Sequence, residues 1–490
     1  MGPTKSSTPV SGQAMAEAGP LKLPLNHHKH QIAPEKLVVE GTGGEYFSTT
    51  QMLSAIFGVP AAAVILVLGP TLTALFWYPV LLLLLGLPSF AAYHVFYALT
   101  AIPNRPQKGL PGLGVSTYLD IKDPALKLRY ASPTSSAATK IPIETFFEAY
   151  FDDKIELKGD MLDILESRYD WASFVWTLAQ LKFFLSQWVP ETLWHSRKQD
   201  TDQVRDHYDR GDDFYNWFLG PMMIYTSGIL SSVSKRETLE EMQQRKLETV
   251  CKKINLQSGE KMLDIGCGWG TLSVHAAKQG ANVTGVTLGR NQTKWSMGKA
   301  KEAGVEDKVR ILCMDYRDIP NEKYNKITCL EMAEHVGVLR FSTFLHQVRE
   351  LLQDDGIFFL QIAGLRRAWQ HEDLMWGLFM AKYVFPGADA SMPLNWVIEQ
   401  VERAGFEVES SETLGVHYSS TLYRWYANWM DNKEKVVAKY GNKWFKVWEF
   451  FLAYSTIIAR QGSATIYQLV LHKNLNSFDR SQFVERRLKN

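Results

Sequence analysis

The sequence predicts an α/β fold: a Rossmann-like domain with a parallel sheet wound on both faces, preceded by a hydrophobic hairpin. From residue 261 onward, short strand-like runs alternate with helix-like runs, an order typical of parallel strands joined by crossover helices. Residues 46–104 contain no Asp, Glu, Lys or Arg. Such a long uncharged stretch is typical of a membrane segment.

The composition narrows the classes of function. The chain has 490 residues, with 53 basic and 52 acidic side chains and a formal charge of +1, so no charge excess points to a nucleic-acid partner. The four cysteines form no CxxC motif, and we predict no metal site. Residues 1–45 lack hydrophobic periodicity and predict a disordered N-terminal arm.

The uncharged segment, residues 46–104, predicts a transmembrane hairpin. A spanning helix needs about 20 apolar residues, so the segment has room for two, over Met52–Gly69 and Thr71–Ala92. Gly69-Pro70 would form the turn. Prolines inside the segment interrupt regular helix, which leaves open a re-entrant or monotopic hairpin, or a buried one.

Residues 105–200 predict a linker and a membrane-proximal helical region. Within it, "ESRYDWASFVWTLAQLKFFLSQWVPETLW", residues 166–194, has the pattern of one long apolar helix. Its aromatic residues suit a helix that lies on a membrane or packs on the body of the protein, with a third membrane span as the alternative. Residues 201–490 have the composition of a soluble domain, which we place in the cytosol.

The elements of this last domain follow from its hydrophobic pattern. The run "QQRKLETVCKK", residues 243–253, predicts a solvated helix face, and helices are also predicted over 271–280 and 291–304. Strands are predicted over 261–266, 282–288, 309–315, 326–332 and 356–363. In such folds ligands bind at the carboxyl ends of the strands, near the first loop.

That first loop reads Gly266-Cys267-Gly268-Trp269-Gly270. A dinucleotide fingerprint requires glycine where this chain has Thr271, and an acid about 20 residues later to hold the ribose. Residues 286–289 supply no acid, and no GKS or GKT follows the loop as a phosphate loop would require. The loop therefore disfavours NAD, flavin and nucleotide phosphates.

Asp264 lies just before the loop. A carboxylate at a glycine turn suits a ligand with a positive amino group, and S-adenosylmethionine carries an amino acid moiety, a sulfonium and an adenosine. The loop lets a backbone approach such a ligand without cradling a phosphate. These features favour the class I S-adenosylmethionine-dependent methyltransferase fold.

Seven ordered motifs identify a family. They are "HYDRGDDFYNWFLGPMMIYTSG" (207–228), "MLDIGCGWG" (262–270), "GVTLGRNQ" (285–292), "MDYRDIP" (314–320), "EMAEHVG" (331–337), "KYVFPG" (382–387) and "HYSSTLYRWYANW" (417–429). Over residues 200–475 the chain resembles the cyclopropane fatty-acid synthase family, which includes the mycolic acid methyltransferases. With the hairpin in front, it most resembles the fungal sphingolipid 9-methyltransferases.

The resemblance implies the contacts with the cofactor, from a lid, a floor under the cofactor, a pair at the ribose and a pair at the adenine. The residues are Tyr225 and Thr226 for the lid; Met262, Leu263, Asp264, Ile265, Gly266, Cys267, Gly268, Trp269 and Gly270 for the floor; Thr287 and Gln292 at the ribose, with Leu288, Gly289, Arg290 and Asn291 of the same segment also at the cofactor; and Tyr316 and Arg317 at the adenine.

The resemblance also implies a bicarbonate ion that acts as base. Its ligands would include Glu334, in the "EHVG" motif, and Tyr418. Two further positions depart from the family pattern, because Ser227 stands where family members have Cys and Gln361 where they often have His. Both side chains can still hydrogen-bond an anion.

The reaction implied is transfer of a methyl group to C-9 of an unsaturated sphingoid base, with the double bond restored. The lipid would be a ceramide or glucosylceramide, met at the endoplasmic reticulum membrane. Methyl transfer to an alkene leaves a carbocation, which aromatic faces stabilise; Tyr316, Trp425 and Tyr426 are candidates. A cyclopropane synthase, a membrane oxidoreductase and a non-catalytic lipid-binding protein are the alternatives.

Overall fold

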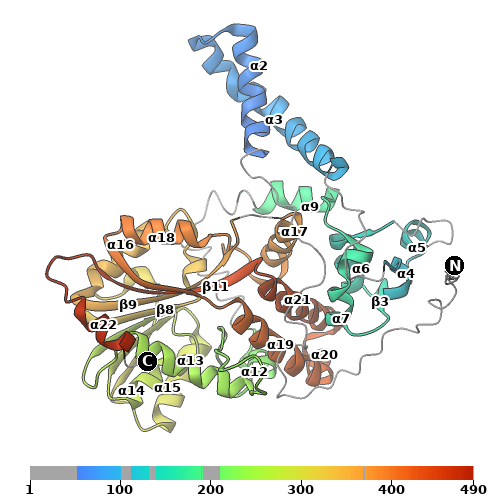
Figure 1. Cartoon of the computed structure of the whole chain (residues 1–490). Coiled ribbons are helices and arrows are strands. Elements are labelled where there is room, and N and C mark those ends of the chain that lie inside the picture. The colour runs from blue at the N-terminus through green and yellow to red at the C-terminus, as the bar shows by residue number, and fades with distance from the viewer. Residues whose placement is uncertain are drawn as a thin grey trace, which may run out of the picture.

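A computed structural model of the chain describes residues 52–100, 112–131, 139–188, 190, 210–367 and 370–488. It contains a large sheet with helices on both faces, a helical lobe beside the sheet, and a helical hairpin that projects from the body (Figure 1). The predicted disordered arm, residues 1–45, and the predicted domain boundary at residue 200 lie outside the described residues.

The large sheet has seven strands in the order β10-β11-β9-β8-β5-β6-β7. Five of them are parallel neighbours and match the five strands predicted from the sequence. Their bounds are β5 Lys261–Ile265, β6 Asn282–Thr287, β7 Val309–Cys313, β8 Tyr324–Leu330 and β9 Leu352–Leu365. The order reverses at β5, so the carboxyl end of this strand opens a crevice for ligands.

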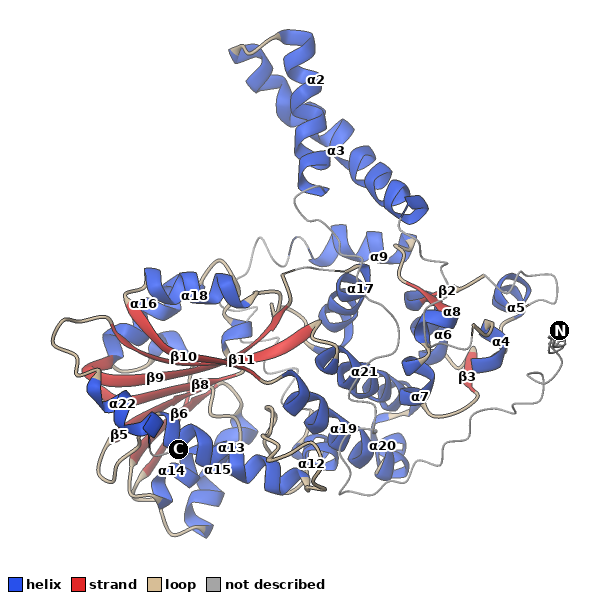
Figure 2. Ribbon diagram, in the orientation of Figure 1, coloured by secondary structure: helices blue, strands red, loops and turns tan. Residues whose placement is uncertain are grey.

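The remaining two strands correct the prediction of a purely parallel sheet. β10 (Phe406–Thr413) and β11 (Ala464–Lys473) are antiparallel to each other, and β11 is antiparallel to β9. The chain passes from β9 to β11 through several helices rather than one crossover helix, which allows the reversed direction. The sheet is therefore mixed (Figure 2).

Helices cover both faces of the sheet (Figure 2). One face carries α13 (Leu239–Lys253), α14 (Thr271–Lys278) and α15 (Arg290–Glu302), and the other carries α16 (Phe341–Leu351) and α18 (Leu394–Arg403). Each layer buries an apolar cluster against the strands. The predicted helices over 271–280 and 291–304 are confirmed as α14 and α15.

The helical lobe joins segments from both ends of the chain. Its main helices are α6 (Ile143–Phe151), α7 (Met161–Glu166), α17 (His371–Phe379), α19 (Gly415–Asp431) and α21 (Asn442–Arg460). They share one large aromatic-rich core.

The chain also forms shorter elements, some in the lobe and some beside the large sheet. They are α4 Val115–Tyr118, β1 Leu119–Ile121, α5 Pro124–Tyr130, β3 Ile155–Leu157, α12 Asp212–Leu219, η3 Tyr316–Asp318, η4 Ala333–His335, η5 Met380–Val384, α20 Lys433–Tyr440 and α22 Ser481–Leu488.

The single long helix predicted over residues 166–194 is wrong within the described residues. The chain forms α8 (Arg168–Trp171), then β4 (Ala172–Ser173), which pairs in parallel with β2 (Ile141–Pro142). A new helix, α9 (Leu178–Phe183), begins at Thr177 and is continued by η2 (Phe184–Trp188). The side chain of Thr177 caps α9 by accepting from the N–H of Gln180, so a local capping box overrides the apolar periodicity.

The hydrophobic segment forms a hairpin of η1 (Ser54–Gly58) and α2 (Val59–Leu68) against α3 (Leu72–Thr100). The predicted turn at Gly69-Pro70 is confirmed, with Gly69 at a φ of +67°. α3 continues through Pro79 and Pro88. In the part of the chain that the structure describes, no helix combines the length and apolar character needed to cross a membrane, so the predicted pair of transmembrane helices is not supported.

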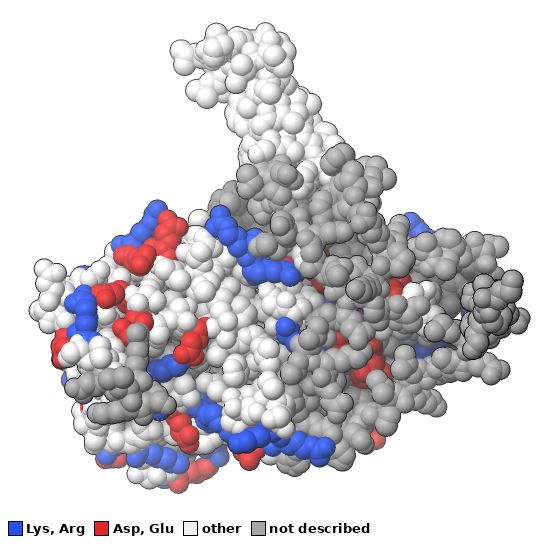
Figure 3. Space-filling model, viewed as in Figure 1, with Lys and Arg blue, Asp and Glu red and all other residues white. Residues whose placement is uncertain are grey.

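The surface of the hairpin is apolar. Leu66, Leu72 and Leu83 are more than 80% exposed, and the hairpin lacks the charged side chains that mark the body of the protein (Figure 3). The base of α3 reaches the body through Phe90, whose ring centroid lies 5.7 Å from that of Trp176 and 6.4 Å from that of Phe184.

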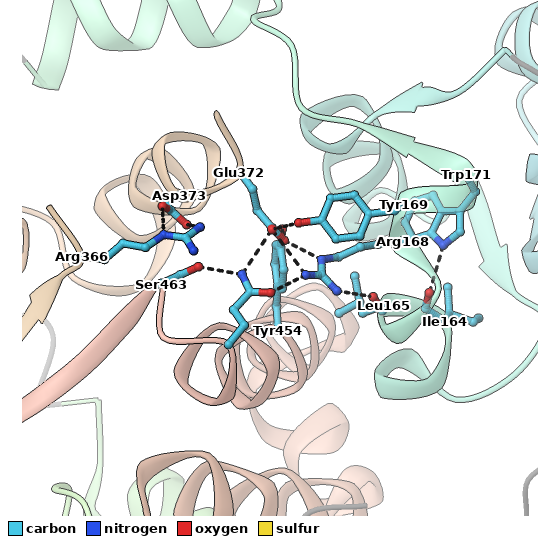
Figure 4. A network of polar contacts seen from close by, with 11 residues as sticks. Ile164, Leu165, Arg168, Tyr169, Trp171, Arg366, Glu372, Asp373, Tyr454 and Ser463 are labelled. Atoms are coloured by element: carbon cyan, nitrogen blue, oxygen red, sulfur yellow. Dashed lines mark hydrogen bonds and ion pairs between the residues drawn. The ribbon is translucent and has the colours of Figure 1, made fainter. Parts of the chain in front are cut away.

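A buried ion pair ties the lobe together (Figure 4). Arg168 Nε donates to Glu372 Oε1 at 2.5 Å, and neither side chain is exposed beyond 2%. The hydroxyls of Tyr169 and Tyr454 also donate to the Glu372 carboxylate. Burial alone would raise the pKa of Glu372, but Arg168 and the two hydroxyls hold it below its usual value.

Replacing Arg168 should therefore destabilise the fold strongly. In Arg168→Met the Glu372 carboxylate stays buried without its cation, and removing one partner of a buried pair costs about 3–5 kcal/mol. Denaturant unfolding measures the loss. The control is Lys443→Met, which breaks an exposed pair with Asp152 and should change the free energy of unfolding by only about 0.5 kcal/mol. Equal effects of the two substitutions would contradict the assigned role of Arg168.

Candidate active site

A pocket of about 150 Å³ opens where the central strands end. It is lined by the loop after β5, by the ends of β6 and β8, and by the segment before α13. This is the position that the reversal of strand order at β5 predicts.

The glycine loop shapes one wall of the pocket. Gly266, Gly268 and Gly270 all have positive φ, at +76°, +53° and +78°. A Cβ on Gly266 would lie 2.5 Å from Met332 Cβ, and one on Gly270 would lie 2.5 Å from Ser296 Oγ. A Cβ on Gly268 would meet nothing within 4 Å, so its backbone faces open space. Two glycines thus allow close packing, and the third presents bare backbone to a ligand.

Asp264 lies beneath this loop at the end of β5. Its side chain is buried and accepts hydrogen bonds from Ser273 Oγ at 2.8 Å and Thr328 Oγ1 at 2.9 Å. Burial raises the pKa of Asp264, although both hydroxyls lower it. The carboxylate is fixed in place at the pocket wall, as a group that receives a cation should be.

The opposite wall carries polar and aromatic groups. Thr287 Oγ1 donates to Gln292 Oε1 at 2.6 Å, and both residues are buried at the end of β6 and the start of α15. The guanidinium of Arg317 pairs with Asp315 and lies 5.2 Å from the ring centroid of Tyr316. The wall therefore offers a hydrogen-bonding pair and, beyond it, a flat aromatic surface.

Most of the predicted cofactor residues meet in this pocket. Those that line it are Tyr225, Thr226, Asp264, Gly266, Cys267, Gly268, Trp269, Thr287, Leu288, Gln292, Tyr316 and Arg317. The side chains of Met262, Leu263 and Ile265 instead pack in the core around β5. Gly270 and Gly289 precede α14 and α15, and Arg290 and Asn291 begin α15. Direct contact with a cofactor stays a prediction for every one of these residues.

Ser227 and Gln361, two of the predicted bicarbonate ligands, are brought together around a side chain that the sequence did not single out. The N–H of Ser227 donates to Glu331 Oε1 at 3.0 Å, and Gln361 Nε2 donates to the same oxygen at 2.5 Å. Ser227 Oγ donates to the carbonyl of Gly228 instead. Glu331 itself lines the pocket.

Glu334, the third predicted ligand, is buried on η4, three residues after Glu331. Its Oε1 accepts from the N–H of Ala363, and its Oε2 is buried with no hydrogen-bond partner among the residues that the structure describes. Burial and the charge of Glu331 raise the pKa of Glu334 to about 8. Tyr418, the fourth, lies on α19 with its ring centroid 6.1 Å from that of Trp425.

The sequence also missed Lys246. The predicted solvated face of residues 243–253 is a helix, α13, but Lys246 is only 2% exposed and points into the pocket. Its Nζ donates to Thr226 Oγ1 at 2.6 Å. Burial lowers the pKa of Lys246 to about 8, while Glu331 and Asp264 oppose the shift. Its position on the same helical face as buried Met242 and Val250 was the available signal.

Aromatic rings gather on the lid side of the pocket. Tyr225 lies 5.4 Å from Trp425 and 5.9 Å from Phe385, centroid to centroid. Of the predicted cation-stabilising residues, Trp425 therefore belongs to this cluster. Tyr426 instead donates its hydroxyl to Asp160 at 2.6 Å and joins α19 to the start of α7 within the lobe.

Comparison with known proteins places this geometry among methyltransferases. The profile of a family described as mycolic acid cyclopropane synthetase matches residues 195–469. The chain is 53% identical to sphingolipid C9-methyltransferase 2 of Gibberella zeae, over 92% of this chain and 85% of that protein. It is also 53% identical to the sphingolipid C9-methyltransferase of Komagataella phaffii, over 91% and 92%.

Solved structures that resemble this chain come from the same family of enzymes. Mycolic acid cyclopropane synthase CmaA1, in complex with SAH and CTAB, superposes with a TM-score of 0.53 at 26% identity, covering 56% of this chain and 98% of that one. The cyclopropane synthase MmaA2 from Mycobacterium tuberculosis gives 0.52 at 28%, with the same coverage. Both likenesses support a class I methyltransferase fold.

Gly268→Val tests the pocket. A branched side chain would fill the space where we expect the ligand to meet bare backbone, so S-adenosylmethionine affinity should fall tenfold or more, ~1.4 kcal/mol. Calorimetry measures it. Gly304→Val is the matched control, because Gly304 also has a positive φ and open space around its Cβ but lies outside the pocket. An affinity unchanged in Gly268→Val, or lowered equally in both variants, would remove the loop from the binding site.

Proposed function

The chain belongs to the mycolic acid cyclopropane synthetase family and, within it, to the sphingolipid C9-methyltransferases, and from this we propose its reaction. It transfers a methyl group from S-adenosylmethionine to C-9 of an unsaturated sphingoid base and restores the double bond. The observation that carries the proposal is the identity of about half of all positions with proteins of that name, over nine-tenths of the chain.

The pocket fits S-adenosylmethionine, which supplies an electrophilic methyl group when bound. Asp264 offers a buried carboxylate to its amino group, and the open backbone at Gly268 allows close approach. Thr287 and Gln292 would hold the ribose, and Tyr316 would border the adenine.

The same residues do not fit the bicarbonate ion that the family resemblance implies. The N–H of Ser227 and the amide of Gln361 are both bonded to Glu331 Oε1, so two of its predicted ligands are occupied by a carboxylate of the chain. A second anion beside the buried Glu331 carboxylate would also meet repulsion in a region of low dielectric.

The aromatic cluster suits the charge that develops on the lipid. Methyl transfer to an alkene carbon leaves a cation on its neighbour. Tyr225, which lines the pocket and packs on Trp425, offers an aromatic ring that can stabilise this cation. Their packing also excludes water, which would otherwise trap the cation.

The substrate and location complete the proposal. The lipid is a ceramide or glucosylceramide, and the enzyme works at the endoplasmic reticulum membrane with its catalytic domain in the cytosol. The exposed apolar surface of the α2–α3 hairpin supports membrane attachment, since an apolar patch of this kind marks an interaction surface. Leu178, on α9 below the hairpin, is also 83% exposed.

The product identifies the reaction. Purified protein is incubated with a glucosylceramide that carries an unsaturated sphingoid base and with S-adenosylmethionine whose methyl group is fully deuterated. Restoring the double bond removes a hydrogen from the lipid, so every methyl deuterium should appear in the product by mass spectrometry. A product that lacks one deuterium and carries a cyclopropane ring would identify a cyclopropane synthase instead.

Charges on the hairpin should abolish membrane attachment. In Leu66→Glu/Leu83→Glu, two carboxylates would enter the apolar layer at a cost of several kcal/mol, so binding to phosphatidylcholine vesicles should fall at least tenfold in a flotation assay. S-adenosylmethionine affinity should not change. Leu128→Glu is the control, because Leu128 is 75% exposed on α5, away from the hairpin. Vesicle binding that survives the double substitution would exclude the hairpin as the anchor.

A further inference from the structure

Glu331 adopts a backbone conformation that glutamate rarely takes. It follows β8 directly and has a φ of +53°, in the left-handed region that costs a non-glycine residue roughly 1 kcal/mol or more. Its N–H still donates to the carbonyl of Gln361 at 2.7 Å, so the strand pairing continues up to this point. Strain of this kind persists where the surrounding structure imposes it, which happens most often at functional sites.

The conformation places one carboxylate oxygen of Glu331, a residue that lines the pocket, against two donors and leaves the other without a donor among the described residues. Oε1 accepts from Ser227 N and Gln361 Nε2. Within the described part of the chain, Oε2 makes no hydrogen bond, and Glu331 is among the residues that line the cavity. One oxygen is therefore an anchor, and the second is available for chemistry.

A chain of hydrogen bonds fixes the direction of the Gln361 amide. Gln468 Nε2 donates to Gln361 Oε1 at 2.7 Å, and Lys253 Nζ donates to Gln468 Oε1 at 2.7 Å. Since the Gln361 oxygen is occupied, its NH₂ group must face Glu331. Both glutamines are buried, so the arrangement is rigid and selects an acceptor-only group, an ionised carboxylate, at this place.

We propose that Glu331 is the general base of the reaction, and that its carboxylate occupies the binding position that the family resemblance assigns to bicarbonate. This rests on the proposed function for the identity of the lipid. The alkene electron pair forms the bond to the methyl carbon while sulfur keeps the electrons of the bond that breaks. Glu331 Oε2 then takes the proton from the methylated carbon, and the electrons of that C–H bond restore the double bond.

The surrounding charges suit a base that is ionised near neutral pH. Burial raises the pKa of Glu331 to about 7, while the Ser227 N–H, the Gln361 amide and the Lys246 ammonium each hold it down. The pKa of Glu334 is raised further, so of the two neighbouring carboxyl groups Glu331 gives up its proton first. A base works best when its pKa lies near the working pH.

The position of the carboxylate relative to the cofactor loop supports the assignment. Met332, the next residue, is so close to Gly266 that a Cβ there would lie 2.5 Å from Met332 Cβ. Glu331 therefore lies at the edge of the loop that receives the cofactor. The base and the methyl donor would face the lipid carbon from the same cavity.

Glu331→Gly and Glu331→Gln test the proposal. Glycine relieves the strain of the positive φ and leaves the position of the carboxylate empty. Glutamine keeps the shape of the glutamate side chain but has no basic oxygen. In bicarbonate-depleted buffer both variants should lose about 10²-fold or more in turnover, with S-adenosylmethionine affinity unchanged by calorimetry. Added bicarbonate should restore at least tenfold in Glu331→Gly and should not change the wild type. Asn255→Gly, which relieves a positive φ in an exposed loop, is the control.

A second readout does not depend on the lipid. Titration of ¹³C-labelled bicarbonate followed by NMR should show saturable binding to Glu331→Gly and none to the wild type. Bicarbonate binding to the wild type, full turnover in either variant, or no rescue of Glu331→Gly would overturn the proposal. A collapse of S-adenosylmethionine affinity in both variants would instead make Glu331 a cofactor ligand. Wild-type protein that methylates no sphingolipid would refute the proposed function alone, since the NMR result still shows whether the Glu331 carboxylate occupies the bicarbonate position.

Discussion

The buried pair of Arg168 and Glu372 is the contact on which the arrangement of distant segments depends. It joins α8, from the first part of the chain, to α17, which follows β9. Tyr454 binds the same carboxylate from α21, the helix that precedes β11. β9 carries Gln361 and β11 carries Gln468, so the two strands that orient the Glu331 carboxylate are connected to helices that meet at one ion pair.

The active site concentrates buried carboxyl groups, whose ionisation burial makes unfavourable. Asp264, Glu331 and Glu334 are all near the ends of β5 and β8, and burial raises the pKa of each. Hydrogen-bond donors and one buried lysine offset part of the free-energy cost of ionising these buried groups. A cationic cofactor would offset more, and the site thus resembles a receptor whose electrostatic balance is completed by binding.

Much of this could be predicted from the sequence because the signals are local. The five parallel strands follow from short apolar runs, and the cofactor loop follows from glycines at fixed spacing after Asp264. The antiparallel strands β10 and β11 could not be assigned a direction, since that depends on helices packed far along the chain. The long helix over residues 166–194 failed because a two-residue strand pairing and the cap at Thr177 interrupt an apolar pattern.

The catalytic residues could be predicted from the sequence only in part. Ser227 and Gln361 were recognised as departures from a family pattern, but the pattern says nothing of what replaces the lost partners. Glu331 lies in the same motif as Glu334 and carries no signal of its own. Only the fold shows that its side chain bends back between two donors that are 134 residues apart in the chain.

One oxygen of Glu331 is shared between the backbone N–H at position 227 and the side-chain amide of Gln361. Because the donor at position 227 is backbone, the residue type there can change without removing that hydrogen bond, whereas position 361 must supply a side-chain donor. Effects of substitutions at contacting residues do not add. In evolution we therefore expect positions 331 and 361 to change together and position 227 to vary separately.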